Sequence, residues 1–366
     1  MGPRALTAFF PELATHVPFA ELGQFPTPVV ALAQLADAAL PNVDDCYVKR
    51  DDISSPHYGG NKVRTLESLF GVALQQGLPH VIAVGAYGSN HAVATVLHAP
   101  RAGLSSGAMV FPQPISATAK DNLRVTIARA NVLYPLWHWS SVPLAIWSLR
   151  RRMQRRGTPV LVMPPGGANP VGALGYVSAA LELAEQVRTG QLPSPERIVL
   201  GVGSTCTSAG LLLGCAVATR LGLGFKARPH IVSIRVTPWP VTSRFRIVSL
   251  AHRTSALLSR LSGDARFAFS PAELAQGLEV DGRFLGAGYG RPTAEGLQAM
   301  RTLAPWGGQA LDTTYGAKSA AGLLARLAPQ QGPSVYWATK SSVPLPEITE
   351  AQLQAAPAAL LNWLRG

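Results

Sequence analysis

The sequence predicts an α/β fold, and two observations carry that prediction. Short apolar runs of strand length recur from about Tyr47 onward, and segments with helical periodicity lie between them. The 366 residues are 47% hydrophobic and only 14% charged, so the chain can bury a large core and is not intrinsically disordered. Strands that alternate with helices are typical of parallel sheets covered on both faces.

Six apolar runs are predicted as buried strands. They cover residues 81–84, 108–111, 132–134, 160–163, 198–200 and 230–234. A helix is predicted over 63–74, where apolar residues repeat on one face until Gly77 ends the segment, and another over 211–220. Because ligands of α/β proteins bind beyond the carboxyl ends of the strands, a site is expected in the loops that follow them.

The formal net charge of +12 raises the question of a nucleic-acid partner. The arginines are spread along the chain, and only residues 150–156 form a cluster, which precedes the strand predicted at 160–163. This run is predicted to form the solvated last turns of a helix, where cations suit the helix dipole. A polyanion-binding patch is the alternative, but no interleaved aromatic and basic platform accompanies the run. No nucleic-acid partner is therefore expected.

Export and membrane signals are not expected either. Arg4 is followed by Pro11 and Glu12 before any apolar run of useful length develops. The uncharged stretch at 198–219 is rich in glycine and hydroxyl residues, which predicts a loop and a helix start rather than a membrane span. The three cysteines form no CxxC pair. These observations together predict a soluble cytoplasmic protein.

The first candidate motif is Gly59-Gly60-Asn61-Lys62, at the start of the first predicted helix. A lysine is electrostatically misplaced there, because the helix N-terminus already carries partial positive charge. The two glycines permit a tight backbone and the close approach of a ligand. Lys62 could therefore act as an amine nucleophile toward an aldehyde; an ordinary surface lysine is the alternative.

The second motif runs from Gly201 to Gly210, between a predicted strand and a predicted helix. Its backbone amides and hydroxyl side chains would form a phosphate cradle at a helix N-terminus. It lacks the Gly-Lys-Ser/Thr ending of a nucleotide P-loop, and Cys206 stands where a dinucleotide fingerprint needs its third glycine. A lone phosphate monoester fits best, and a polar turn without a ligand is the alternative.

Other loops offer further polar groups. Gly88-Ser89-Asn90-His91 would present a hydroxyl, an amide and helix-end amides to an anionic substrate, or would simply cap a helix. Tyr289 and Tyr315 each place a phenol in a loop, as a general acid or base or as a packing group, and Thr339 follows an apolar run. The histidines show no metal-ligand spacing and no GxSxG elbow is present, so neither a metal site nor a serine hydrolase is expected.

An aldehyde-capturing lysine, a monophosphate cradle and a late hydroxyl that could face a ring nitrogen together describe a site for pyridoxal phosphate. With these motifs, the chain resembles the fold-type-II pyridoxal-phosphate enzymes, specifically the D-cysteine desulfhydrase and 1-aminocyclopropane-1-carboxylate deaminase family. The resemblance spans about residues 20–342, in order and at family spacing. The matching segments are 25–29, 48–64, 89–91, 165–169, 172–176, 201–210, 288–290 and 311–318.

The resemblance implies an architecture. Two open twisted, mostly parallel sheets flanked by helices are expected, as in the tryptophan synthase β fold, with the cofactor between two domains. The larger domain would combine residues 1–65 and 165–366, and the smaller inserted α/β domain would cover 66–164. A homodimer is the family expectation.

The resemblance also implies how the cofactor is held. Lys62 would be the Schiff-base lysine, Asn90 the partner of the cofactor's phenolic oxygen, and Thr339 the residue that faces the pyridine nitrogen. A neutral hydroxyl at that nitrogen weakens the electron sink and favours elimination over transamination. The phosphate would be held by Gly203, Ser204, Thr205, Cys206 and Thr207.

For the substrate, the resemblance assigns Ser89, Asn90 and His91 as binding residues. Ser89 would meet the carboxylate or assist proton transfer, and Tyr289 and Tyr315 would flank the substrate as further catalytic groups. The implied reaction is α,β-elimination from a small amino acid such as D-cysteine. Lys62 removes the α-proton, a β-leaving group departs, and a 2-oxo acid and ammonia are formed.

Four departures from the family pattern bear on the substrate. Gly316 stands where the cyclopropane deaminases carry a glutamate, which disfavours ring-opening deamination. Ala92-Val93 replaces the usual Arg-Gln, and Pro100 must shorten or kink the helix that follows. Thr339-Lys340-Ser341 replaces Thr-Gly-Gly, so Lys340 lies either beside the cofactor or in solvent.

These departures leave alternatives open. Within the family, three alternatives to a D-cysteine desulfhydrase-like enzyme remain: a 1-aminocyclopropane-1-carboxylate deaminase, a member with an altered substrate, and a member that has lost catalysis. A β-replacement synthase is the nearest rival enzyme, although its usual glycine-containing asparagine loop is absent. Outside enzymes, a phosphate-ligand-binding protein would need only the cradle.

Overall fold

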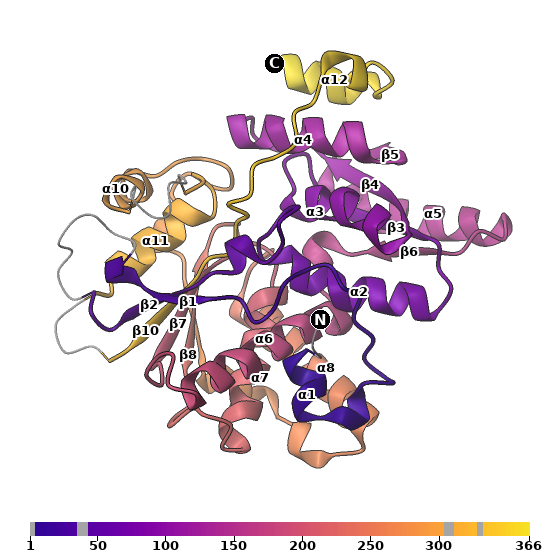
Figure 1. Cartoon of the computed structure of the whole chain (residues 1–366). Coiled ribbons are helices and arrows are strands. Elements are labelled where there is room, and N and C mark those ends of the chain that lie inside the picture. The colour runs from indigo at the N-terminus through magenta and orange to yellow at the C-terminus, as the bar shows by residue number, and fades with distance from the viewer. Residues whose placement is uncertain (1–3, 35–42, 304–310, 328–331) are drawn as a thin grey trace.

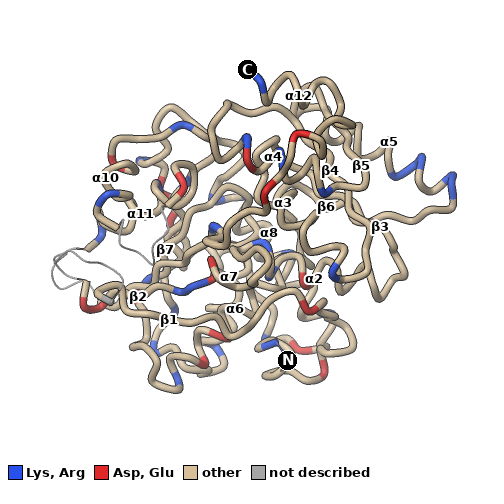
Figure 2. Tube along the Cα trace, turned by 45° about the horizontal axis from the view of Figure 1, so that its top comes forward, with Lys and Arg blue, Asp and Glu red and all other residues tan. Residues whose placement is uncertain are grey.

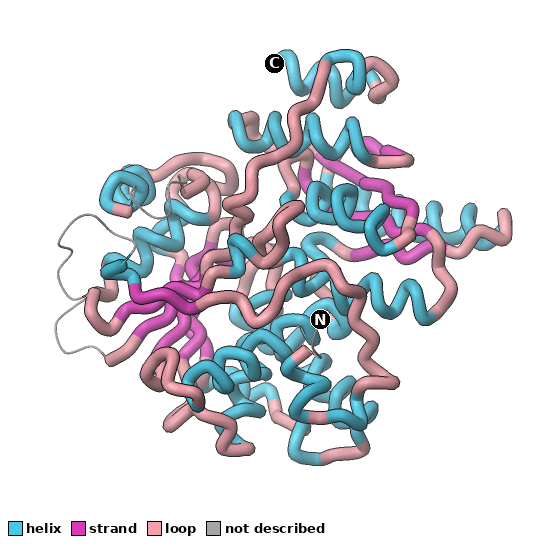
Figure 3. The backbone as a smooth tube through the Cα atoms, in the orientation of Figure 1, coloured by secondary structure: helices cyan, strands magenta, loops and turns pink. Residues whose placement is uncertain are grey.

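The strands form two separate sheets in the computed structural model, which describes residues 4–34, 43–303, 311–327 and 332–366 (Figures 1 and 3). Within these residues, six strands pair in the order β1-β2-β10-β7-β8-β9 and four in the order β5-β4-β3-β6. Every one of these pairs is parallel except that of β1 with β2. The expectation of two mostly parallel sheets flanked by helices is confirmed.

The element bounds are as follows. The six-stranded sheet contains β1 (Val29–Ala31), β2 (Cys46–Lys49), β10 (Ser334–Trp337), β7 (Arg197–Val202), β8 (His230–Arg235) and β9 (Leu278–Asp281). The four-stranded sheet contains β5 (Val132–Pro135), β4 (Ser105–Phe111), β3 (His80–Ala86) and β6 (Val160–Met163). The helices are α1 (Ala5–Phe9), α2 (Lys62–Gln75), α3 (Asn90–His98), α4 (Ala117–Arg129), α5 (Val142–Arg155), α6 (Pro170–Arg188), α7 (Cys206–Arg220), α8 (Arg244–Ser262), α9 (Pro271–Gln276), α10 (Ala294–Thr302), α11 (Gly316–Leu324) and α12 (Ala358–Arg365).

All six predicted strands are present, as β3 to β8, and the helix predicted from residue 63 is α2. The second predicted helix differs at its start, because α7 begins at Cys206 rather than at 211. Gly210, taken as the end of a loop, lies inside α7 where that helix crosses α6, and a Cβ there would lie 2.4 Å from the Ala173 carbonyl oxygen. The glycine therefore serves close helix packing, and the second half of the predicted cradle is a helical turn.

Alternate residues of the six-stranded sheet face different helices. In β7, Ile198 and Leu200 belong to the core shared with α6, α7 and α8, whereas Val199 packs in the core that contains residues of α10 and α11. This period of two is that of a strand buried on both faces. The carboxyl ends of β7 and β10 lie next to each other in the sheet, so the residues that follow both strands meet at one edge.

The four-stranded sheet is covered in the same way. In β3, Val81 and Ala83 face the core that includes α2, α3 and α4, and Ile82 and Val84 face α5. The exposed arginines of the 150–156 run lie at the outer end of α5, as Figure 2 shows, which confirms the predicted solvated last turns. α3 ends at His98 and continues as a 3₁₀ turn over residues 99–102, so the predicted shortening at Pro100 is also confirmed.

The C-terminal segment crosses back to the four-stranded sheet. α12 lies beside α4 in Figure 1, and its Leu360 is buried in the same core as residues of α3 and α4. The Trp363 ring meets the Tyr87 ring edge-on at 5.2 Å. Across the part of the chain that the structure describes, no helix is both long enough and apolar enough to span a membrane.

Candidate active site

Lys62 is the first residue of α2, at the helix start that was predicted for it. The backbone before it packs closely against the turn at 51–53. A Cβ at Gly59 would lie 2.1 Å from the Asp52 carbonyl oxygen, and Gly60 has a φ of +87°, which side-chain-bearing residues rarely adopt. These two glycines are therefore required for the backbone that delivers Lys62.

The Lys62 side chain is 8% exposed. Its ammonium donates to the Gly166 carbonyl oxygen at 3.2 Å and to Ser204 Oγ at 3.1 Å. Burial lowers the pKa of Lys62, against a weaker opposing effect of Cys206. A lowered pKa increases the fraction of neutral amine, which is the nucleophilic and proton-accepting form.

The loop after β7 meets Lys62 directly through Ser204. The Gly203 carbonyl oxygen accepts from Thr242 Oγ1 at 2.7 Å and from Thr237 Oγ1 at 3.1 Å, which fixes the loop backbone. Asn61 Nδ2 donates to Thr207 Oγ1 at 3.0 Å, so the residue before the lysine is tied to the first turn of α7. The amides of that first turn have no intrahelical acceptor and make a site suited to an anion.

Two further cradle residues are buried in the same turn, Thr205 at 6% exposure and Cys206 at 0%. The Cys206 thiol donates to the Gly167 carbonyl oxygen at 3.4 Å, and burial raises its pKa. The thiol is thus already hydrogen-bonded to the turn at 165–167. If Cys206 binds phosphate, it would do so through its backbone amide.

The start of α3 carries Ser89, Asn90 and His91. Ser89 Oγ accepts from the Ala92 amide at 3.3 Å, which is the helix-capping role that the sequence left as an alternative. His91 is 1% exposed, and neither ring nitrogen has a partner among the residues that the structure describes. Burial, and to a lesser degree the charge of Lys62, lowers the pKa of His91 to about 3. A buried neutral imidazole without a partner is the kind of group that a ligand satisfies.

Asn90 is the centre of a polar cluster. Its Oδ1 accepts from Asn122 Nδ2 at 2.9 Å, from Lys340 Nζ at 2.9 Å and from the Tyr58 hydroxyl at 3.2 Å. Lys340 Nζ also donates to the Tyr58 oxygen at 3.1 Å. Of the two positions that the sequence allowed for Lys340, the structure has the one beside the site.

Tyr289 and Tyr315 lie together. Their hydroxyls are 3.2 Å apart and their rings meet edge-on with centroids 6.0 Å apart. Burial raises the pKa of both phenols, so both are protonated at neutral pH. Tyr315 also borders the cradle, because a Cβ at Gly203 would lie 2.7 Å from its phenolic oxygen. Next in the chain, Gly316 begins α11 and a Cβ there would lie 3.1 Å from Leu311 Cβ, so this position has little room for a side chain.

Thr339 follows β10 and is 9% exposed. Its carbonyl oxygen accepts from the Asn61 amide at 2.8 Å, which joins the segment after β10 to the loop before Lys62. The structure therefore brings Lys62, Ser204, Thr207 and Thr339 into one connected set of contacts. Asn90 forms a second set, and the two tyrosines a third that touches the cradle.

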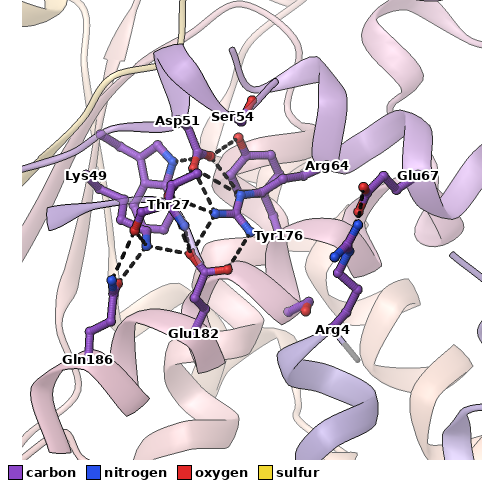
Figure 4. Close-up of polar contacts among 12 residues, drawn as sticks. Arg4, Thr27, Lys49, Asp51, Ser54, Arg64, Glu67, Tyr176, Glu182 and Gln186 are labelled. Atoms are coloured by element: carbon purple, nitrogen blue, oxygen red, sulfur yellow. Dashed lines mark hydrogen bonds and ion pairs between the residues drawn. The ribbon is translucent and has the colours of Figure 1, made fainter. Parts of the chain in front are cut away.

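Sequence reasoning missed a buried ionic network around Asp51, Arg64 and Glu182 (Figure 4). The Asp51 carboxylate accepts from Arg64 at 2.8 Å, Tyr176 at 2.8 Å and the Trp337 indole at 2.7 Å. Glu182 pairs with Arg64 and with Lys49, whose pKa is lowered by burial. Arg64 is two residues after Lys62 and Trp337 two before Thr339, so the network fixes both segments.

Tyr58 and Asn122, which hold Asn90, were missed as well. Tyr58 lies four residues before Lys62, inside a segment already singled out, so its position was an available signal. Asn122 lies in α4, among helix-forming residues with no motif around it. Nothing in the sequence marks its contact with Asn90.

The residues present fit pyridoxal phosphate. A buried amine of lowered pKa is suited to an aldehyde, and the amide- and hydroxyl-rich first turn of α7 lies one hydrogen bond away through Ser204. Two glycines give space beside these groups: a Cβ at Gly166 would lie 3.4 Å from Lys62 Nζ, and a Cβ at Gly167 would lie 3.3 Å from Cε1 of His91, whose ring has no partner among the described residues.

Comparisons with known proteins agree with this fit. The family model described as pyridoxal-phosphate dependent enzyme matches residues 20–339. A nocardicin C-9' epimerase of Nocardia uniformis subsp. tsuyamanensis is 34% identical over 81% of this chain and 86% of its own length. A D-cysteine desulfhydrase of Salmonella paratyphi C is 30% identical over 85% of this chain and 88% of its own.

A solved structure leads to the same family. A crystal structure described as an ACC deaminase homologue superposes with a TM-score of 0.71 at 28% identity, and covers 93% of this chain and 95% of its own. The family match spans most of the chain and includes the lysine, the cradle and both tyrosines. The chain belongs to the family of pyridoxal-phosphate-dependent enzymes, and its cofactor is pyridoxal phosphate.

Proposed function

We propose that this enzyme catalyses α,β-elimination from a small amino acid, with D-cysteine as the first candidate, and forms a 2-oxo acid and ammonia. The observation that carries the proposal is the Lys62 amine, buried, lowered in pKa and hydrogen-bonded to Ser204 at the rim of the anion-binding turn. The D-cysteine desulfhydrase relative, aligned over most of both chains, supports the substrate class.

When bound, pyridoxal phosphate supplies an electron sink for the pair left at the substrate's α-carbon. The chain's own groups do the rest. Lys62 would hold the aldehyde, and its neutral amine would take the α-proton. The first turn of α3, with Ser89, Asn90 and His91, would bind the substrate's carboxylate, and Thr339 would offer a neutral hydroxyl to the pyridine nitrogen.

The paired phenols are proposed as the proton source for the leaving group. Both hydroxyls are protonated at neutral pH because burial raises their pKa values, and each can donate to the other. The group that departs from D-cysteine is hydrosulfide, and a protonated phenol beside it could donate the proton that gives hydrogen sulfide.

The substrate proposal is tested by incubating the reconstituted enzyme with D-cysteine and measuring sulfide and pyruvate. L-Cysteine and 1-aminocyclopropane-1-carboxylate serve as comparison substrates. Sulfide and pyruvate in equal amounts from D-cysteine are expected. A protein that binds the cofactor yet releases neither product from D-cysteine would overturn the proposal. Rapid consumption of 1-aminocyclopropane-1-carboxylate would contradict the inference that Gly316 disfavours ring-opening deamination.

Epimerisation at the α-carbon is a second candidate, because the epimerase relative is 34% identical. It shares with elimination the removal of the α-proton by Lys62 and differs in returning a proton instead of expelling a group. Amino acids without a leaving group separate the two. Stereoinversion of D-alanine in D₂O, with deuterium at the α-carbon and no 2-oxo acid, would favour the epimerase.

We further infer a two-domain division at residues 1–65 with 165–366 and 66–164, a homodimer, and a cytoplasmic location. The two separate sheets support the division. Cys46, Cys206 and Cys215 are all free and buried, as suits a reducing compartment. Light scattering of the purified enzyme tests the dimer, and fractionation of the source cells tests the location.

A further inference from the structure

Lys340 connects the loop before Lys62 with the polar cluster around Asn90. The segment that contains it follows β10 and packs along the loop before Lys62: the Gly59 amide donates to Ser341 Oγ at 3.0 Å, and the Asn61 amide to the Thr339 carbonyl oxygen at 2.8 Å. From there the Lys340 side chain reaches to the first residue of α3. A lysine here bridges the cofactor lysine's loop and the proposed substrate-binding turn.

The ammonium of Lys340 has neutral acceptors. It donates to Asn90 Oδ1 at 2.9 Å and to the Tyr58 oxygen at 3.1 Å, and it lies 5.4 Å from the Tyr58 ring centroid. Over residues 4–34, 43–303, 311–327 and 332–366, none of the ion pairs includes Lys340. Buried Lys49, by contrast, is paired with Glu182. Among the described residues the partly buried Lys340 ammonium therefore has no carboxylate partner, which an anionic ligand would supply.

The surroundings of Lys340 increase the local positive potential. Asn90, its nearest partner, is the first residue of α3, whose N-terminus carries partial positive charge. A cation beside a helix N-terminus is unfavourable unless an anion joins them. In the same turn, the buried imidazole of His91 has no partner among the described residues. The ring lies on the side of Gly167, where a Cβ would be 3.3 Å from His91 Cε1, and Lys340 lies on the side of Asn90 and Tyr58, so the two groups border the first turn of α3 from different directions.

We propose that Lys340 is a specificity-determining residue that binds a carboxylate of the amino-acid substrate, together with the first turn of α3. The inference rests on the proposed function, because it takes an amino acid as the ligand. Two sources of the carboxylate share this chemistry: the α-carboxylate, or a second carboxylate in the side chain. Lys340 remains hydrogen-bonded to Asn90 and Tyr58, which fix its ammonium toward the ligand.

The test uses the pyridoxal-phosphate-loaded enzyme and measures equilibrium binding rather than turnover. Titrations followed by absorbance of the bound cofactor compare D-alanine with D-alaninamide, and D-glutamate with D-glutamine. The variants are Lys340→Gln, which removes the charge, and Lys340→Arg, which keeps it. Lys226→Gln, a change at an exposed lysine outside the site, is the matched control.

In Lys340→Gln, the Kd of a carboxylate ligand should rise at least about tenfold relative to its amide partner, since one charge-assisted hydrogen bond is lost. Lys340→Arg should restore most of the preference. A change in the D-alanine pair assigns the α-carboxylate, and a change confined to the D-glutamate pair assigns a side-chain carboxylate. Either result supports the proposal.

Equal loss for acid and amide, or no loss, overturns it, as does a shift of the cofactor's absorption without any change in the acid-to-amide ratio. The last result would mean that Lys340 acts on the cofactor. Failure of the proposed function is distinguishable, because an enzyme that releases no sulfide from D-cysteine can still show the acid-to-amide preference.

Discussion

Lys62 and Arg64 are two residues apart in α2, yet they belong to clusters of opposite character. Arg64 joins a network in which Asp51, Glu182 and Lys49 are matched charge for charge and the remaining oxygens accept from hydroxyls and an indole. Lys62 joins a cluster whose partners are a carbonyl and a hydroxyl. Both clusters are buried, so burial alone does not distinguish them.

The two clusters differ in whether their buried charged and polar groups all have partners. A buried charge is costly unless an opposite charge and hydrogen bonds compensate it, and the network around Asp51 supplies both. In the other cluster, burial lowers the pKa of Lys62. Among the residues that the structure describes, the His91 ring has no hydrogen-bond partner and Lys340 donates to neutral acceptors. The cluster around Asp51, whose charges are all compensated, holds the backbone in place. The cluster around Lys62, whose groups lack such partners, is the one expected to bind cofactor and substrate.

Removal of the Lys62 amine should give the largest effect on activity. Lys62→Ala is expected to lower turnover by at least about 100-fold, because the same amine holds the aldehyde and moves the α-proton. The measurement is steady-state product release, alongside the visible absorption band of lysine-bound pyridoxal phosphate, which should disappear. Lys226→Ala, outside the site, should change neither. Unchanged turnover in Lys62→Ala would contradict the assignment of this lysine.

Damage to the cluster around Asp51 should instead lower stability. Glu182→Gln removes one charge from the network and leaves Lys49 and Arg64 undercompensated, which should cost about 3–5 kcal/mol in the free energy of unfolding. Glu185→Gln is the matched control in the same helix: its ion pair with Arg188 is exposed and should matter by less than about 1 kcal/mol. Urea unfolding of both variants measures the difference, and equal effects would refute the contrast.

The same carboxylate predicts a pH dependence. Although burial opposes ionisation, Arg64 and Lys49 hold the pKa of Glu182 at about 2, below its ordinary value of 4.5. The folded state therefore binds this proton less readily than the unfolded state, so the stabilisation is complete above pH 4.5 and is lost as the pH falls toward 2. The gap in unfolding free energy between the native enzyme and Glu182→Gln should shrink over that window. A gap that stays constant would contradict the pKa direction.

The smallest effect distinguishes two histidines in α3. No described residue bonds the His91 ring, whereas His98 Nε2 bonds the Tyr58 carbonyl oxygen at 2.8 Å. His98→Leu should cost about 1–3 kcal/mol of stability, because it leaves that carbonyl unsatisfied. His91→Leu should be nearly neutral for stability and should weaken ligand binding instead. Urea unfolding and cofactor titration of both variants provide the check; a large stability loss in His91→Leu would argue for a structural role.

The strands and the two chemical loops were predictable because they depend on local signals. Apolar runs mark β3 to β8, and the paired glycines before Lys62 and the glycine- and hydroxyl-rich turn after β7 stand out in the sequence. The presence of two sheets and the site roles were reached through family resemblance. The order of the strands was not predicted, since no local pattern specifies which strands pair.

The ionic network could not be predicted for a physical reason. Asp51 meets Tyr176 and Trp337 across 125 and 286 residues of sequence, and each of these residues alone is an ordinary core or surface type. The same holds for Asn122 against Asn90. Contacts of this kind depend on the packing of whole elements, which no local pattern in the sequence specifies.

The return of the chain from β10 to α12 has a consequence for the molecule as a whole. The chain passes between the two sheets three times: after β2, after β6 and after β10. No single cut can therefore release either sheet with its core complete, since residues 66–164 alone would lack Leu353 and Leu360. Neither sheet, taken with its core, is therefore encoded by one continuous stretch of the chain.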